Sequence, residues 1–325
     1  MEYTYPKISN CLIYKKHDMY SVEVTDYFTD EVYLVELEEA KYMKKLDGKT
    51  HPYDIETNLT EEEIDCLIAE LDNCGLLKES NKIAGGGTAM RTIWEPKWTI
   101  KLRIIAFLCN NLLMILWLPV LIIGIIVFKN NWLSIDFEMI WLGNIIGLGF
   151  GIVLHEFGHA FAGASYGARV FEMGVLRMYY IIPGAYVILD DKTVKNRLKR
   201  VQINAAGVEM NLFLVGVFLI LGAIFGNLGG MFLTAAIQNA FLAALNLTLI
   251  KGLDGMAIVS ELLGIEDIIE TATDVIINRG IRNELREYGT SGNATIAACY
   301  MVGAFQIALP LLLLLNVLEV VVCFV

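Results

Sequence analysis

The sequence predicts a mainly α-helical membrane protein, a polytopic bundle of about five spans with an interfacial β-hairpin. A small N-terminal α+β soluble domain, winged-helix-like, is predicted to precede the bundle. Of the 325 residues, 56% are hydrophobic, and the mean hydropathy is +0.54, well above the level of a soluble chain of this length. Long apolar runs recur in the last two thirds of the chain, whereas the first 95 residues are polar and acidic.

The acidic segment carries almost all of the net charge. Its first 95 residues hold 20 acidic and 10 basic side chains, and the whole chain has a net charge of −11. Such a segment repels phosphate backbones, so no nucleic acid is expected as a partner. The chain opens without an apolar stretch, so no cleaved signal peptide is expected.

Local patterns within this segment predict its elements. Residues 10–25 indicate a hairpin, because two apolar stretches flank a polar turn. Residues 32–46 have helical spacing of apolar side chains. Thr60, followed by three glutamates, forms a capping box that starts a second helix. A short strand is predicted at Leu76-Leu77. Together, these elements suggest a small winged-helix module.

The domain boundaries follow from these changes in composition. We expect a soluble domain over residues 1–80, a glycine-containing linker over 81–100 and a transmembrane domain over 101–325. A stretch from Val170 to Leu189 predicts the hairpin, with its turn at Pro183-Gly184. The spans are expected in the apolar runs near 104–128, 139–165, 203–226, 230–250 and 295–325.

The basic residues predict the orientation. Segments 167–202 and 251–294 contain seven and four of them, whereas segment 129–138 contains only Lys129. Basic loops stay on the cytoplasmic side. We therefore expect a multi-pass protein of the cell membrane, in contact with the lipid bilayer, with its N-terminal domain in the cytoplasm.

A metal-binding pattern lies inside the second apolar run. Residues 155–159 are His-Glu-Phe-Gly-His, and helical spacing puts His155 and His159 on one face, where both can bind one zinc ion. Glu156 is placed to act on a water molecule rather than on the metal. Polar side chains of this kind are costly in lipid and mark function.

A third ligand is required, since a catalytic zinc has three protein ligands and one open position. His17 and His51 lie in the acidic domain, so the third ligand must be a carboxylate. Asp254 follows the fourth apolar run and is expected at the same membrane depth as the two histidines. The sequence thus predicts a ligand set of His155, His159 and Asp254.

These motifs resemble those of the site-2 protease family of intramembrane zinc metallopeptidases. That family pairs His-Glu-x-x-His with Asn-x-x-Pro-x-x-x-x-Asp-Gly, and Asn246 and Asp254-Gly255 match the second motif in type and spacing. The family proline is replaced by Leu249, and Gly252 is expected to interrupt the helix instead. The Gly-x-x-x-Asn pattern of a third span is matched by Gly207 and Asn211.

The resemblance is closer to the branch called peptide zinc metalloproteases, and it covers roughly residues 145–265. The order of Gly167-Ala168-Arg169-Val170, an apolar hairpin, a basic segment and Ala205-Ala206-Gly207 is similar to that branch. The N-terminal domain resembles the PqqD-like peptide-recognition domain in Leu46-Asp47-Gly48-Lys49-Thr50 and in the segment 71–77.

The resemblance implies an intramembrane zinc metalloendopeptidase that removes the leader of a ribosomally synthesised precursor peptide near the cytoplasmic face. Zinc is the implied cofactor, Glu156 the implied catalytic base, and Asn246 and Asn211 the implied substrate-binding residues. Two alternatives stay open: regulated cleavage of a membrane-anchored regulator, and a non-proteolytic exporter or immunity protein on the same scaffold. The peptide sequence cleaved and the oligomeric state are not predicted.

Overall fold

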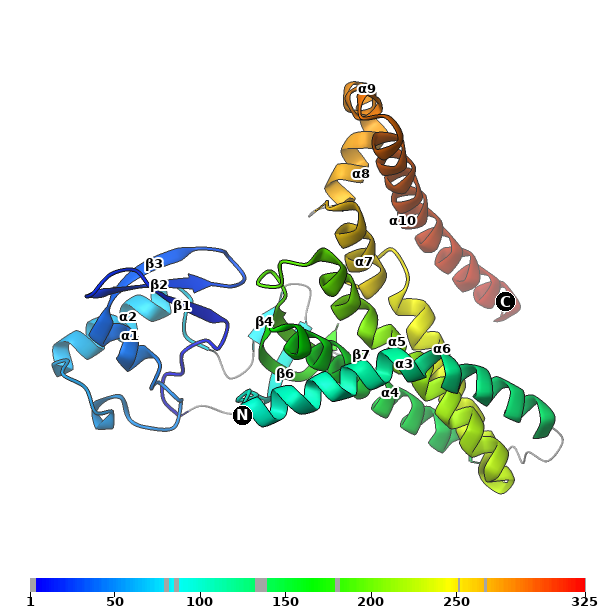
Figure 1. Ribbon diagram of the computed structural model, residues 1–325, viewed down its shortest axis with the longest axis horizontal. Helices are drawn as coiled ribbons and strands as arrows, with labels where there is room; N and C mark the ends of the chain where they lie inside the picture. Colours follow the sequence, from blue (N-terminus) through cyan, green and yellow to red (C-terminus); the bar gives the residue numbers. More distant parts are fainter. Residues whose placement is uncertain are drawn as a thin grey trace. The chain divides into compact units, whose positions relative to one another are not determined.

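The chain forms two compact units that interleave along the sequence. Met1–Lys101 and Ala168–Asp190 form the first unit, and Leu102–Gly167 and Asp191–Val325 form the second. Helix dominates the secondary structure (Figure 1). The computed structural model describes residues 4–78, 82–84, 88–131, 139–178, 182–250, 252–265 and 268–324.

A three-stranded antiparallel sheet, in the order β1-β2-β3, opens the first unit. Strands β1 (Leu12–Lys16) and β2 (Ser21–Asp26) confirm the predicted hairpin. The helix predicted over 32–46 is wrong in its first part, where β3 (Val32–Glu36) pairs with β2. Its valines and tyrosine favour an extended strand, and α1 (Leu37–Met43) begins only after it.

Two further elements complete this part of the unit. They are the short 3₁₀ helix η1 (Pro52–Asp54) and the helix α2 (Glu61–Asn73). The capping box is confirmed, because Thr60 Oγ1 accepts from the Glu63 amide at 3.3 Å and the Glu63 carboxylate accepts from the Thr60 amide at 2.7 Å. The strand predicted at Leu76-Leu77 is only a single bridge from Leu77.

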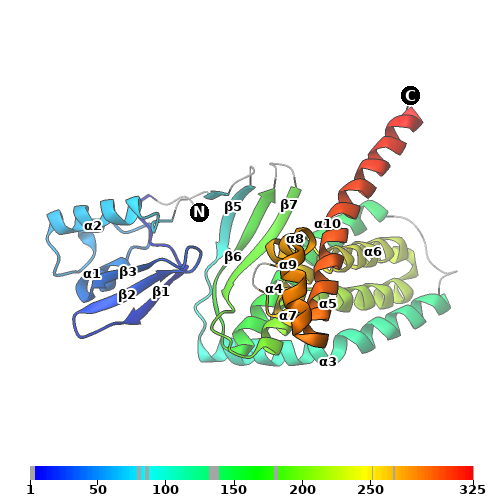
Figure 2. The ribbon, with the colours of Figure 1, turned by 90° about the horizontal axis from the view of Figure 1, so that it is seen from above.

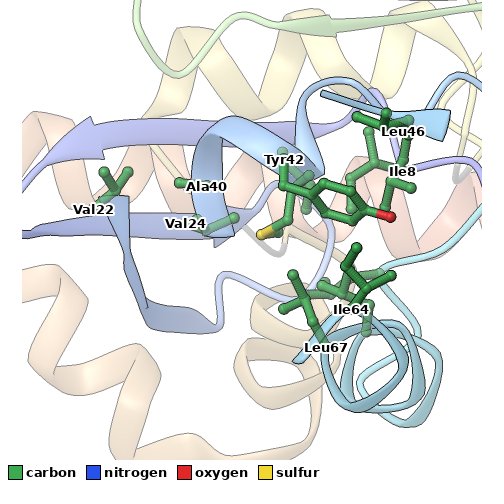
Figure 3. Packing of buried hydrophobic residues seen from close by; sticks show 13 residues of the cluster. Ile8, Val22, Val24, Ala40, Tyr42, Leu46, Ile64 and Leu67 are labelled. Atoms are coloured by element: carbon green, nitrogen blue, oxygen red, sulfur yellow. The ribbon is translucent and has the colours of Figure 1, made fainter. Parts of the chain in front are cut away.

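The core of this domain lies between its helices and the sheet. One face of α2 contributes Ile64, Leu67 and Leu71, as its apolar spacing predicts. Figure 3 labels eight of the packed side chains: Ile8, Val22, Val24, Ala40, Tyr42, Leu46, Ile64 and Leu67.

A second antiparallel sheet follows the order β4-β5-β6-β7. The predicted hairpin is present as β6 and β7, but its predicted turn is wrong, because Pro183 pairs with Arg177 inside β7. Proline is tolerated there because β7 is an edge strand. Strands β4 and β5 lie within 81–100, the segment predicted as a linker, of which 81 and 85–87 are outside the described residues. The strands are β4 (Lys82–Ala84), β5 (Thr88–Trp94), β6 (Arg169–Met178) and β7 (Ile182–Asp190).

A largely buried group of charges connects the segments at Lys7 and Lys78 to the second sheet within the first unit. Lys7 forms an ion pair with Glu95, and Lys78 forms ion pairs with both Glu95 and Glu172. The Tyr186 hydroxyl donates to Glu172 Oε1 at 3.0 Å. We call Lys7, Lys78, Glu95 and Glu172 the lysine–glutamate cluster. Its positive and negative charges are equal in number.

The second unit contains the membrane region. Four helical segments are long and apolar enough to span a bilayer, among the residues that the structure describes. Helices α4, α5 and α6 pack against one another (Figure 1), while many apolar side chains of α3 are exposed, as a lipid-facing helix requires. The elements are α3 (Ile100–Asn131), α4 (Ile140–Tyr166), α5 (Arg197–Ile224), η3 (Gly226–Leu228) and α6 (Gly229–Asn246).

Four more helices end the chain. Helix α10 packs against α8 and α9 (Figure 2), over buried residues that include Val275, Cys299 and Val302. The fifth predicted span, 295–325, falls on α10, whose side chains beyond residue 306 are not described, so the count of five stays a prediction. The helices are α7 (Asp254–Leu263), α8 (Ile268–Ile277), α9 (Arg279–Glu287) and α10 (Gly289–Phe324).

A close helix crossing brings the elements of the candidate site together. At Gly158 on α4, an added Cβ would lie 2.6 Å from the carbonyl oxygen of Ala206 on α5. Only glycine permits this approach, and small residues are the usual means of close packing between membrane helices. The face of α4 that carries the histidines therefore lies directly against α5.

Candidate metal centre

Helix α4 places the two histidines of the motif side by side. His155 and His159 are one helical turn apart and both are buried, with ring centroids 4.7 Å apart. Their Nε2 atoms lie 3.1 Å from each other. The spacing of four residues thus does what the sequence predicts and aims both rings at one point.

Asp254 reaches the same point from another element. It is the first residue of α7, and its Oδ2 lies 3.2 Å from His155 Nε2 and its Oδ1 3.3 Å from His159 Nε2. Among the described residues, these three side chains form a group able to hold a metal ion, with their ligand atoms within 4.8 Å of one another. The predicted convergence of two distant segments is present.

The backbone between α6 and α7 explains how the carboxylate arrives there. Helix α6 ends at Asn246 without a proline, and Gly252 has a φ of +89°, which glycine adopts at low cost. Gly255 packs against the same loop: an added Cβ would lie 2.8 Å from the carbonyl oxygen of Thr248. The two glycines therefore allow the tight reversal that presents Asp254.

The far end of α7 is also held. The Arg200 guanidinium forms an ion pair with Glu261 at 2.9 Å, and Arg197 donates to the carbonyl oxygen of Glu261. Both arginines lie at the start of α5. Helix α7 is therefore fixed to α5 at one end and presents Asp254 at the other.

Helix α5 accepts a hydrogen bond from the Nδ1 atom of each imidazole. His159 Nδ1 donates to the carbonyl oxygen of Ile203 at 2.7 Å, and His155 Nδ1 donates to Asn211 Oδ1 at 2.9 Å. A neutral imidazole with its proton on Nδ1 has a lone pair on Nε2. Both lone pairs consequently point toward each other and toward the Asp254 carboxylate.

This arrangement fits a zinc ion. The two nitrogens and the carboxylate are all acceptors in this state, and buried Asp254 Oδ2 makes no hydrogen bond among the described residues. A cation at their common point would satisfy all of them. Tetrahedral zinc with bonds of ~2.1 Å separates its ligand atoms by roughly 3.4 Å, close to the separations of 3.1, 3.2 and 3.3 Å.

Gly207 provides the space for such an ion. An added Cβ would lie 2.7 Å from His155 Nε2 and closer still to His159 Nε2. Glycine at this position leaves the metal-facing side of both rings unobstructed. The sequence shows Gly207 as part of a motif, but nothing in it predicts that the missing side chain faces the imidazoles.

The other predicted site residues are placed as follows. Glu156 is half-buried on α4 beside His155 and is not one of the three grouped donors. The side-chain amide of Asn246 donates to the Leu242 carbonyl of its own helix at 3.1 Å. Asn211 is the partner of the His155 ring. Sequence reasoning missed the role of the Ile203 carbonyl, because a backbone group leaves no signal in residue type.

Comparison with known proteins supports the chemistry of this site. Residues 143–229 match the model of peptidase family M50, the site-2 proteases. This segment contains both histidines and Glu156, and it ends before Asp254. No curated protein and no solved structure matches the chain. The family match and the compatible His/His/Asp group make this protein a zinc-dependent intramembrane metalloprotease.

Proposed function

We propose that the protein removes the leader of a ribosomally synthesised precursor peptide, by cleavage near the cytoplasmic face of the membrane. The observation that carries the site assignment is the convergence of His155, His159 and Asp254 on one point. The M50 match supplies the enzyme class. The assignment of a precursor peptide as the substrate rests on the N-terminal domain, which we take to be residues 1–80.

In the proposed mechanism, His155, His159 and Asp254 hold the zinc ion. When bound, zinc supplies the Lewis acidity that lowers the pKa of a water molecule toward ~7 and polarises the scissile carbonyl. Glu156 accepts the proton of the attacking water and delivers it to the leaving amine nitrogen. Its position beside His155, outside the three donors, suits this role.

Two asparagines are proposed to bind the substrate backbone. Asn246 ends α6, just before the loop that leads to Asp254, so its amide is close in sequence to the ligand. Asn211 Oδ1 is already bonded to His155, which leaves its Nδ2 as the group for a substrate carbonyl. Buried Asn211 Nδ2 has no hydrogen-bond partner among the described residues.

The N-terminal domain supports the capture of a peptide. Strand β3 lies at the edge of its sheet, and Val32 and Leu34 on this strand are 61% and 63% exposed. An exposed edge accepts an extended peptide through main-chain hydrogen bonds, and apolar side chains on it add affinity. We therefore propose that β3 binds the leader, and that the domain lies in the cytoplasm, as the basic loops indicate.

The test is reconstitution of the protein in vesicles with candidate precursor peptides, followed by mass spectrometry of the products. Glu156→Gln should reduce cleavage by about 10²- to 10⁴-fold, the usual contribution of a general base, while the zinc content stays unchanged. Full cleavage by this variant would contradict the mechanism. Absence of zinc from the purified wild-type protein would contradict the ligand set.

A second pair of variants tests leader capture separately. Leu34→Asp on β3 should weaken binding of the precursor peptide, because a charge replaces an exposed apolar contact. Met19→Asp is the matched control, since Met19 is also exposed, at 72%, but lies in the β1–β2 turn. Equal peptide binding by both variants would show that β3 is not the leader site, and the protease assignment would be unaffected.

A further inference from the structure

Helix α5 makes three separate contributions to the metal centre along one stripe. Ile203, Gly207 and Asn211 follow at intervals of four residues, so they share one face of the helix. Ile203 and Asn211 accept hydrogen bonds from the Nδ1 atoms of His159 and His155. Gly207 lies between them and leaves space beside the Nε2 atoms of both rings.

The two histidines are held by different kinds of group. The partner of His159 is a backbone carbonyl, which α5 presents whatever side chain stands at 203. The partner of His155 is the side chain of Asn211. The proton position and the ring orientation of His155 therefore depend on the identity of one residue, whereas those of His159 depend on the path of the backbone.

Asn211 lowers the stability of the fold. Its side chain is fully buried, and its Nδ2 has no hydrogen-bond partner among the described residues. Burial of a polar amide with only part of its hydrogen bonds made costs stability. An apolar residue of similar size would pack here without that cost, so stability does not explain the asparagine.

We propose that Asn211 is a positioning residue for the metal centre: it fixes the Nδ1–H tautomer of His155 and so presents the Nε2 lone pair to the zinc ion. Groups that hydrogen-bond the non-coordinating nitrogen of a metal-binding histidine commonly contribute about 10- to 100-fold to metal affinity. The inference rests on the proposed ligand set. It adds a role that is distinct from contact with the substrate.

The experiment measures zinc affinity of the purified full-length protein by competition with a chromogenic chelator. Asn211→Leu removes the acceptor at nearly constant volume and should lower zinc affinity by about 10- to 100-fold. Asn211→Asp keeps an acceptor at the same place and should retain zinc affinity near the wild-type value. The Co²⁺-substituted proteins provide a second readout, since their visible spectra report the ligand geometry.

Asn239 offers a matched control on the neighbouring helix α6. It is also fully buried, and its amide donates to the carbonyl oxygens of Gly147 and Ala235 rather than to a histidine. Asn239→Leu should change thermal stability in detergent but leave zinc affinity unchanged. A loss of affinity in both leucine variants would mean a general packing effect and would overturn the proposal.

Two outcomes separate this inference from the proposed function. If the wild-type protein binds zinc and Asn211→Leu binds it equally well, the positioning role is wrong and the ligand set stands. If His155→Ala leaves wild-type zinc affinity unchanged, the ligand set itself is wrong, and the positioning role is wrong with it. Reduced affinity in Asn211→Leu with recovery in Asn211→Asp supports the proposal.

Discussion

Each of the two units buries a group of polar side chains, and the two groups differ in how their charges are balanced. In the lysine–glutamate cluster, two cations face two carboxylates, and Tyr186 and Thr92 donate to Glu172 as well. In the metal centre, the imidazole lone pairs and the Asp254 carboxylate converge without a positive charge among them.

This difference distinguishes charges that are buried to stabilise the fold from acceptor groups that are buried to bind a metal ion. A buried ion pair needs its own partner and nothing else, so the lysine–glutamate cluster is complete within the chain. A group of acceptors aimed at one point needs a cation from outside. Removing a partner from the first group should destabilise the fold, whereas changing the second should alter metal binding first.

The largest effect on metal binding is expected from Gly207→Ala. The added methyl group would press on the Nε2 atoms of His155 and His159, and misplacement of a catalytic group by 1 Å can cost about 100-fold in rate. We expect loss of bound zinc and at least that loss of cleavage, with unchanged helical content by circular dichroism. Wild-type zinc content in this variant would show that the space beside the rings is not needed.

A separate effect, on stability rather than on chemistry, is expected from Lys78→Met. It leaves Glu172 charged, buried and without its lysine, and breaking a buried pair costs about 3–5 kcal/mol. Hydrogen exchange of the β5 and β6 amides should accelerate accordingly. Adding Glu172→Gln removes the unpaired charge while keeping an acceptor for Tyr186, so exchange should slow again. Zinc content should stay constant in both variants, and its loss in either would contradict the division between the two groups.

The smallest effect is expected from lowering the pH, which protonates the carboxylate of Glu95. Burial by itself raises the pKa of Glu95, but the hydrogen bond from Lys7 and the charges of Lys7 and Lys78 bring it below its ordinary value. A lowered pKa in the folded state stabilises the fold above the unfolded value of about 4.3, and this contribution is lost as the pH falls through the folded pKa. The protection factors of the amides near β5, which correct for the intrinsic pH dependence of exchange, should therefore fall below about pH 4, and this fall should be smaller in Glu95→Gln.

Local spacing explains which features the sequence could predict. His155 and His159 meet because a helix repeats its faces every four residues, and Thr60 caps its helix through a motif four residues long. The convergence with Asp254 was predictable because alternating spans return to the same membrane side. These inferences need only helical geometry and the direction of each span.

The remaining features depend on contacts between distant elements. Lys78 and Glu172 are 94 residues apart, and no local pattern shows that a supposed linker forms strands beside the hairpin. The apolar spacing of the strand Val32–Glu36 also fits a helical period, and only its pairing with β2 makes this segment a strand. The acceptor for His159 is a main-chain atom, which residue identity cannot reveal.

The absence of a side chain at Gly207 limits the substitutions that this position can accept. Every amino-acid substitution of glycine introduces a residue with at least a Cβ atom, so no substitution at this position keeps the space open. A saturation mutagenesis screen for cleavage should therefore find Gly207 as intolerant as the two histidines. The most constrained site in the protein would then include a residue with no functional group at all.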